Sequence, residues 1–212
     1  LWISLLVRAI PALIGALVIA FSQDHSPRFG FLVFGVVLIV SGIMVGFEAV
    51  GITGHPARGF VYARALLSTV TGGVALFFAA DSHDLGTAGA FIMVVSIWGI
   101  VTGLIELAGA YVTRRHQLYS GEILISGALT LLIGVIIAFV PADLLIQLGG
   151  IEQVEGTLDA SVTAVGLVGG FFTVLGVLLV VEAITLRSAL RRRSADVARE
   201  SASPTTPEEA PR

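Results

Sequence analysis

The residues of this sequence that could do chemistry are charged side chains at the ends of long apolar runs. Two arginines stand near the starts of such runs, one glutamate begins another, and three glutamates lie where runs end. Guanidinium and carboxylate groups in such places can pair with each other, bind an ion or a proton, or anchor a helix at a membrane surface. The six candidate residues are Arg8, Glu48, Arg64, Glu106, Glu122 and Glu182.

Two interpretations of these six residues are open. In the first, they are interfacial anchors or Arg–Glu pairs that close helical hairpins, because a long side chain near a helix end reaches the headgroup region. Such a side chain avoids most of the roughly 2.5 to 3.5 kcal/mol that a charge costs at mid-membrane. In the second, the carboxylates form a ring that lines a polar vestibule. The first interpretation is the simpler one and is favoured.

Other catalytic or cofactor-binding patterns are missing from the sequence. It contains no HExxH, no phosphate-binding Walker loop, no GxGxxG after a strand and no GxSxG, and it contains no cysteine. Asp24–His25 and Asp81 with His83 occur at matching turns. They could bind a metal weakly or respond to external pH, but short polar turns use the same residues. We predict a protein that is not an enzyme, with no cofactor, no metal and no nucleic-acid partner.

The composition indicates that the solvent of this chain is a lipid bilayer. Hydrophobic residues make up 56% and charged residues 13%, with a mean hydropathy of +0.97, whereas charged residues are usually about 25% of a soluble domain. Helices that cross a membrane need about 20 apolar residues each. The runs are continuous rather than alternating, which predicts an all-α fold with six transmembrane helices. The runs are 1–21, 29–52, 62–80, 85–112, 123–140 and 161–186.

Arginine is distributed unevenly over the loops and ends of the chain. All twelve basic residues are arginine, and alternate assignment of the loops puts eleven of them on one side and Arg28 alone on the other. Cytoplasmic segments of membrane proteins are enriched in Lys and Arg. We therefore expect both termini in the cytoplasm and a multi-pass location in a cell membrane, the inner membrane of a bacterium.

The chain also contains an internal repeat. Gly15, Gly72 and Gly134 each precede an aspartate by nine residues. This spacing predicts three tandem helical hairpins, at about 1–52, 62–112 and 122–186, in one domain of residues 1–186. Small residues four apart let two helices approach closely in lipid. We expect such packing, or a dimer interface, at Gly42, Gly46, Gly99, Gly103, Gly166 and Gly170.

Two segments depart from the apolar runs. The longest outer loop, 141–160, mixes Leu and Ile with acidic residues, and Gly149 and Gly150 should break any helix there. Beyond residue 186 the chain begins with a basic cluster, suited to anionic lipid, and then becomes rich in Pro, Ser, Thr and Glu. We predict that 187–212 is a disordered cytoplasmic tail.

The repeated hairpin resembles a known family. Each unit has a Gly-centred helix, a turn with Asp or Pro-Ala-Asp, and a Gly-rich helix that ends in FEA, IEL or VEA; the first two begin near an Arg. Over 8–186 this pattern is similar to the HdeD-like membrane proteins, which are short-repeat proteins of unknown function. The third unit lacks the Arg, and the loop 141–160 and the tail are longer than the pattern.

The resemblance implies an association with acid or envelope stress tolerance and transfers no catalytic residues. We expect a non-enzymatic membrane protein with lipids as its first partners. It would act alone, as a homo-oligomer or as an accessory subunit of a larger membrane complex. The alternative is a small transporter or channel that uses the inner carboxylates.

Overall fold

The protein is a bundle of helices with one short strand pair. The computed structural model describes residues 2–52, 54, 56–81, 85–114, 120–147 and 157–202. Two three-residue strands, β1 Leu145–Gln147 and β2 Thr157–Asp159, pair antiparallel between the last two helices. The helices are α1 Trp2–Phe21, α2 Pro27–Gly51, α3 Arg58–Ala80, α4 Ala88–Thr113, α5 Ser120–Ala138 and α6 Ala160–Ala202.

Helix starts follow local capping chemistry. Ser26 accepts a hydrogen bond from the Phe29 backbone N–H, and Pro27 occupies the first turn of α2, where its missing N–H costs nothing. Thr87 accepts in the same way from Ala90 at the start of α4. Asp159 Oδ1 accepts from the Val162 N–H at 2.8 Å. Polar turn residues therefore cap α2, α4 and α6, whereas α3 begins after Ala57 without a side-chain cap.

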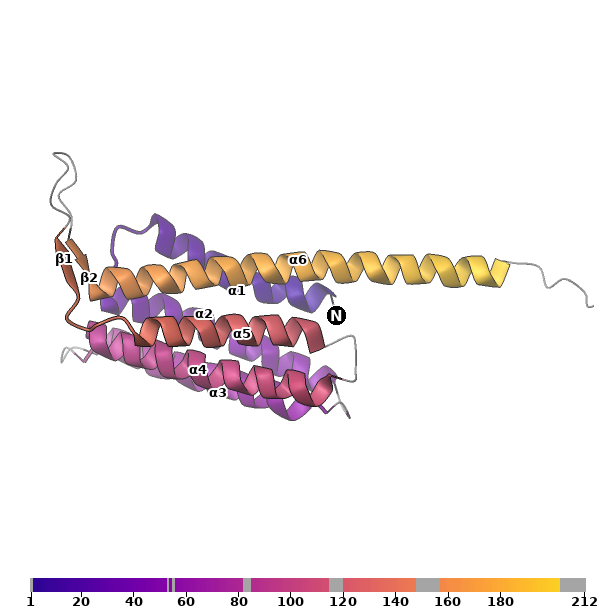
Figure 1. The fold of residues 1–212 in the computed structure, drawn as a ribbon, viewed down its shortest axis with the longest axis horizontal. Helices are drawn as coiled ribbons and strands as arrows, with labels where there is room; N and C mark the ends of the chain where they lie inside the picture. Colours follow the sequence, from indigo (N-terminus) through magenta and orange to yellow (C-terminus); the bar gives the residue numbers. More distant parts are fainter. Residues whose placement is uncertain are drawn as a thin grey trace, which may run out of the picture.

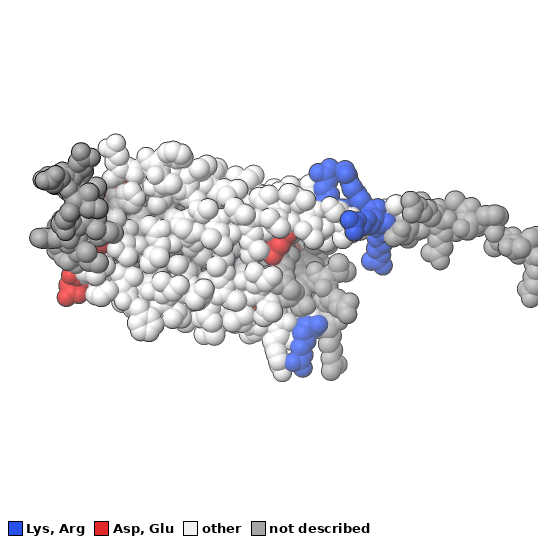
Figure 2. All heavy atoms as spheres, turned by 45° about the horizontal axis from the view of Figure 1, so that its top comes forward, with Lys and Arg blue, Asp and Glu red and all other residues white. Residues whose placement is uncertain are grey.

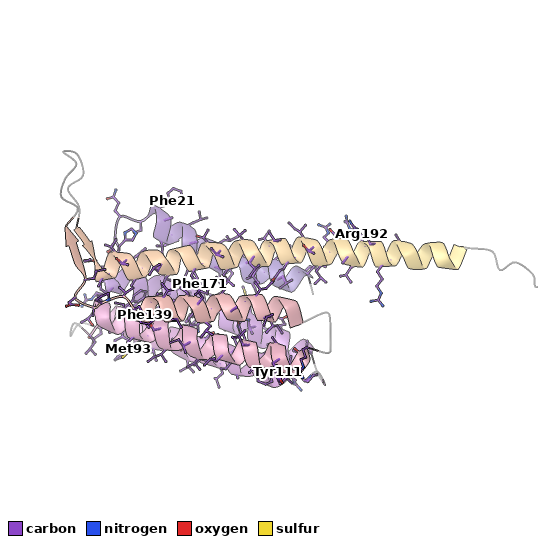
Figure 3. The ribbon with its side chains drawn as sticks, viewed as in Figure 1. Phe21, Met93, Tyr111, Phe139, Phe171 and Arg192 are labelled. Carbon is purple, nitrogen blue, oxygen red and sulfur yellow. The ribbon has the colours of Figure 1, made fainter. Side chains whose placement is uncertain are left out.

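The surface of the bundle is apolar, as expected in lipid. Among the residues that the structure describes, four helices are long and apolar enough to cross a membrane, namely α2, α3, α4 and the first part of α6. The apolar helical segments Leu5–Phe21 and Ile123–Ala138 are shorter. Phe21, Phe139 and Tyr111 are exposed on the outside of the bundle (Figure 3). An exposed apolar surface of this extent is compatible with a membrane location.

The helices run side by side along the long axis of the molecule, and α6 projects beyond the others at one end (Figure 1). The most extensive helix contacts are α2 with α3, α4 with α5, and α1 with α6. These pairs differ from the consecutive hairpins that the sequence predicts, which are α1–α2, α3–α4 and α5–α6. The two helices of each predicted hairpin are therefore not the ones that pack most closely.

Glycines explain the choice of neighbours. A Cβ added to Gly72 would lie 2.8 Å from the Gly35 carbonyl oxygen, so α2 and α3 meet backbone to backbone there. A Cβ on Gly99 would lie 2.8 Å from the Cα of Gly134, which brings α4 against α5 in the same way. Close backbone approach increases van der Waals contact, which helix association in lipid requires.

Aromatic rings fill the centre of the bundle. Phe34 is fully buried, and its ring lies 5.3 Å from Trp98 and 6.1 Å from Phe91, both in edge-to-face geometry. Phe172 of α6 stacks on Phe34 at 6.3 Å. These distances are in the favourable range for aromatic pairs. The aromatic cluster therefore ties α2, α4 and α6 together.

Residues 187–202 continue α6 as a helix. The sequence prediction of a disordered tail differs from the structure over this segment, while 203–212 lie outside the described residues. The reason is local: RSALRRRSADVARESA is rich in Arg and Ala, which have high helix propensity, and it contains no Pro or Gly. The low hydropathy of the segment indicated exposure, which is compatible with a solvated helix.

Basic residues gather at one end of the molecule. Figure 2 shows basic side chains at the end from which α6 projects, and acidic side chains both at the opposite end and on the surface nearer the basic end. We call the first the arginine-rich end; α2 and α4 finish there and α3 begins there.

Candidate functional site

The first candidate pair joins α1 to α2 near the arginine-rich end. Arg8 Nη1 donates a hydrogen bond to Glu48 Oε2 at 3.3 Å. The two side chains are 10% and 15% exposed, so both are largely removed from the surface. A charge-assisted hydrogen bond of this kind connects the first helix to the end of the second.

The second pair joins α3 to α4 at a corresponding place. Arg64 Nη1 lies 2.7 Å from Glu106 Oε1, with side-chain exposures of 20% and 2%. Neither oxygen of Glu106 has a hydrogen-bond partner among the described residues. The short contact is therefore an ion pair whose geometry does not suit a hydrogen bond. Glu106 is the more deeply buried of the two paired carboxylates.

The other two candidate glutamates, Glu122 and Glu182, are described in less detail by the structure. Glu182 lies on α6 and is partly buried. Glu122 lies in the first turn of α5, but its side chain is outside the described set. The structure thus brings Arg8, Glu48, Arg64 and Glu106 to one end of the bundle. A complete ring of carboxylates stays a prediction.

Two small cavities adjoin these ion pairs. The end cavity lies toward the arginine-rich end and has a volume of about 40 Å³; both ion pairs contribute to its wall, beside Phe60, Val61 and Ile123. The central cavity, also about 40 Å³, lies deeper in the bundle. Arg8, Val45 and Arg64 line both cavities. The two arginines therefore stand between the carboxylates and the middle of the bundle.

All six helices contribute to the central cavity. Its apolar wall includes Phe171 and Phe172 of α6. The Phe171 side chain is buried (Figure 3). Its polar wall consists of arginine, tryptophan and hydroxyl groups, with no Asp or Glu among the lining residues that the structure describes. The polar lining residues are Arg8, Ser41, Arg64, Ser68, Trp98, Thr102 and Thr130.

Hydrogen bonds of the central cavity are only partly satisfied. Trp98 Nε1 donates to Ser68 Oγ at 3.2 Å, which gives the deeply placed tryptophan its partner. Thr130 donates to the Ser126 carbonyl oxygen one turn earlier at 2.8 Å. Thr102 is 1% exposed, and its Oγ1 has no partner among the described residues. An unsatisfied buried hydroxyl costs about 1 to 3 kcal/mol, so this group calls for a ligand or a water molecule.

The hydroxyl groups of this cavity are functional candidates that sequence reasoning missed. Ser41, Ser68, Thr102 and Thr130 each lie within an apolar run. A single Ser or Thr in a membrane helix usually bonds to its own backbone, so no one of them is a signal. Their common signal is that four successive helices each place a hydroxyl near mid-helix.

The turns between α1 and α2 and between α3 and α4 hold local hydrogen bonds. Asp24 Oδ1 accepts from the Ser26 backbone N–H at 2.8 Å, and hydrogen bonds from Ser26 lower the pKa of Asp24 below its ordinary value. Arg28 donates to the Asp81 carbonyl oxygen at 3.0 Å and so links two turns. No group of three His, Asp or Glu side chains that could hold a metal occurs among the described residues, which exclude His83.

The six predicted packing glycines fall into three groups. A Cβ on Gly42, Gly99 or Gly103 would lie under 3.0 Å from a neighbouring helix, so these three sit at tight crossings. Gly46 is looser, at 3.9 Å from the Ala65 Cβ. Gly166 and Gly170 have nothing within 4 Å; they are exposed and line an apolar groove between α5 and α6.

Comparison with known proteins adds no relative. No protein-family model, no curated protein and no solved structure matches this chain. The arguments that follow therefore rest on the chain itself.

Proposed function

We propose that this chain is a non-enzymatic integral membrane protein of the HdeD-like type that acts in envelope or acid stress tolerance, alone or as an accessory subunit of a membrane complex. The observation that supports this proposal is the pair of ion pairs, Arg8–Glu48 and Arg64–Glu106. Each links the first helix of a proposed hairpin to the end of the second. Ion pairs between helices at one end of the bundle favour a structural protein over an enzyme, because they hold the helix ends together.

The proposed architecture has six transmembrane helices in three tandem hairpins, with both termini in the cytoplasm. The equivalent positions of the two ion pairs support the repeat, and the basic residues at one end of the bundle support the orientation (Figure 2). The chain contains no cysteine, so single engineered cysteines report unambiguously. A cysteine at Ser201 should be labelled only from the cytoplasmic side, and one at Gln23 only from outside. The reverse pattern contradicts the orientation.

A survival assay tests the stress role. Cells that lack the protein should survive a shift to acid medium less well, and the wild-type gene should restore survival. Arg64→Gln should restore it poorly, because that change leaves Glu106 buried without its ion-pair partner. Asp24→Asn, in an exposed outer turn, is the matched control and should restore it fully. Equal survival with and without the protein contradicts this proposal. Copurification with a large partner would favour the subunit form.

A second candidate function is a small transporter or channel. The supporting observation is that the central and end cavities share Arg8, Val45 and Arg64 on their walls, so polar groups extend from the arginine-rich end toward mid-bundle. Flux of protons or small ions into proteoliposomes should then fall when Glu48, Glu106 and Glu182 are changed to Gln. Flux that is unchanged in this triple variant removes the candidate.

A further inference from the structure

The central cavity has a hydrogen-bonding wall that suits small neutral ligands. Four successive helices, α2 to α5, each contribute one hydroxyl group to this wall. The two arginines that line the cavity are each ion-paired with a glutamate, so the formal charges of these four residues cancel. A charged ligand would therefore be buried without a charge to balance it, whereas a neutral ligand needs only partners for its hydrogen bonds.

The Thr102 hydroxyl group is the strongest indication that the cavity holds a ligand. Thr102 is almost fully buried and lines the cavity, and its Oγ1 has no hydrogen-bond partner among the described residues. Buried hydroxyl groups without a partner are rare in folded proteins. Where protein atoms supply no partner, an ordered water molecule commonly does.

Two other hydroxyl groups of the wall retain hydrogen-bonding capacity. Ser68 Oγ accepts a hydrogen bond from Trp98 Nε1, which leaves the Ser68 O–H able to donate. The Thr130 O–H donates to the Ser126 carbonyl oxygen, which leaves the Thr130 oxygen able to accept. Together with Thr102, these groups supply the roughly two to four polar partners that a buried water molecule needs.

We propose that the central cavity holds a small cluster of water molecules, hydrogen-bonded to the hydroxyl groups of Ser68, Thr102 and Thr130. The cavity has a volume of about 40 Å³, and one buried water needs about 10 to 15 Å³, so there is room for about three. These hydroxyl groups belong to α3, α4 and α5, so the cluster links three helices inside the bundle. Hydration of the cavity does not depend on either proposed function, because it is compatible with a structural bundle and with a transporter.

Ser96 provides an internal reference. It is buried on α4, as Thr102 is, and its Oγ also has no partner among the described residues. Ser96 lines neither the central cavity nor the end cavity. A serine without room for water beside it can bond instead to the carbonyl oxygen one turn earlier in its helix. We therefore expect water next to Thr102 and none next to Ser96.

Water-edited solid-state NMR tests this expectation on the full-length protein in lipid bilayers. Magnetisation passes from water protons to nearby side chains, so isotope-labelled Thr and Ser residues that contact water gain signal at short mixing times. The Thr102 signal is identified by its loss in Thr102→Val, and the Ser96 signal by its loss in Ser96→Ala. In the wild type, Thr102 and Ser68 should gain signal faster than Ser96.

The same two variants show whether the Thr102 hydroxyl group holds the water. Thr102→Val keeps the shape of the side chain and removes one polar partner from the cavity wall, so the Ser68 signal should grow more slowly than in the wild type. Ser96→Ala is the matched control, because it removes a buried hydroxyl group that lines neither cavity. It should leave the growth of the Ser68 signal unchanged.

Two results overturn the proposal. If Thr102 gains signal no faster than Ser96, the cavity is dry. If Thr102→Val and Ser96→Ala have equal effects on the Ser68 signal, the Thr102 hydroxyl group does not hold the water. Should Thr102→Val fail to fold, sequential assignment identifies the Thr102 signal, and the comparison of Thr102 with Ser96 in the wild type decides the question.

Discussion

The two ion pairs, Arg8–Glu48 and Arg64–Glu106, are alike in sequence position and different in setting. In the first, the charges make a 3.3 Å hydrogen bond and both side chains keep some exposure. In the second, a 2.7 Å contact holds a carboxylate that is only 2% exposed. The cost of leaving a charge unpaired rises with burial. The same residue types at equivalent places should therefore have unequal energetic roles.

The largest expected difference follows from removing the arginines. Arg64→Ala leaves Glu106 buried without its counter-charge and should reduce the free energy of unfolding by about 3 to 5 kcal/mol. Arg8→Ala should cost about 1 to 2 kcal/mol, because Glu48 can reach water more easily. Reversible unfolding in mixed micelles, followed by tryptophan fluorescence, measures both. Equal losses would contradict the comparison.

Neutralising the carboxylates should reduce the free energy of unfolding by smaller amounts, and again more for the Arg64–Glu106 pair than for the Arg8–Glu48 pair. Glu106→Gln keeps the shape and removes the ion pair, and we expect a loss of about 1 to 3 kcal/mol. Glu48→Gln retains a hydrogen-bond acceptor for Arg8 and should cost no more than about 1 kcal/mol. The same unfolding measurement applies, and a larger loss for Glu48→Gln would reverse our ranking.

Replacing both members of the buried pair should have a smaller effect than removing one. Arg64→Met together with Glu106→Leu removes both charges and keeps apolar volume, so stability should return to within about 1 kcal/mol of the wild type. A double-mutant cycle with the single variants then gives the coupling energy. A double variant as unstable as Arg64→Ala would show that the pair is required for reasons other than charge balance.

The turn between α1 and α2 provides the smallest expected effect and a pH test. The lowered pKa of Asp24 means that its ionised form stabilises the folded state. This contribution is present above the ordinary pKa of an aspartate and is lost as the pH falls through the lowered folded value. Asp24→Asn should cost a few tenths of a kcal/mol at pH 7, because the group is exposed. In thermal unfolding at varied pH, the difference from wild type should shrink as the pH falls below the ordinary pKa of an aspartate and disappear only below the lowered pKa of the folded state.

The sequence predicted much of the helical pattern and some of the site. Long apolar runs between polar turns determine where most helices begin and end, so the first five expected runs agree closely with α1 to α5, whereas α6 continues to Ala202, beyond the sixth run. Arg8 and Glu48 belong to consecutive helices whose ends meet when the turn between them is short. A pattern along one chain contains that information.

Neighbours across the bundle could not be predicted in this way. Tight packing depends on which glycine faces which partner, and Gly99 opposite Gly134 has no signal in either run alone. Gly166 and Gly170 have the same spacing as Gly99 and Gly103, yet they face an open groove. The central cavity depends on four hydroxyls from four helices, which only the folded arrangement brings together.

The length of α6 has a consequence for what can contact the protein beyond the helix bundle. At 1.5 Å per residue, its 43 residues extend about 65 Å, roughly twice the thickness of a hydrocarbon layer. A continuous helix resists bending, so α6 holds the residues near its C-terminal end at a fixed distance from the bundle. The triplet Arg191, Arg192 and Arg193 therefore stands at a set height from the bundle, as Arg192 does in Figure 3. A docking protein or an anionic surface that binds these guanidinium groups would therefore be held at that same distance from the bundle.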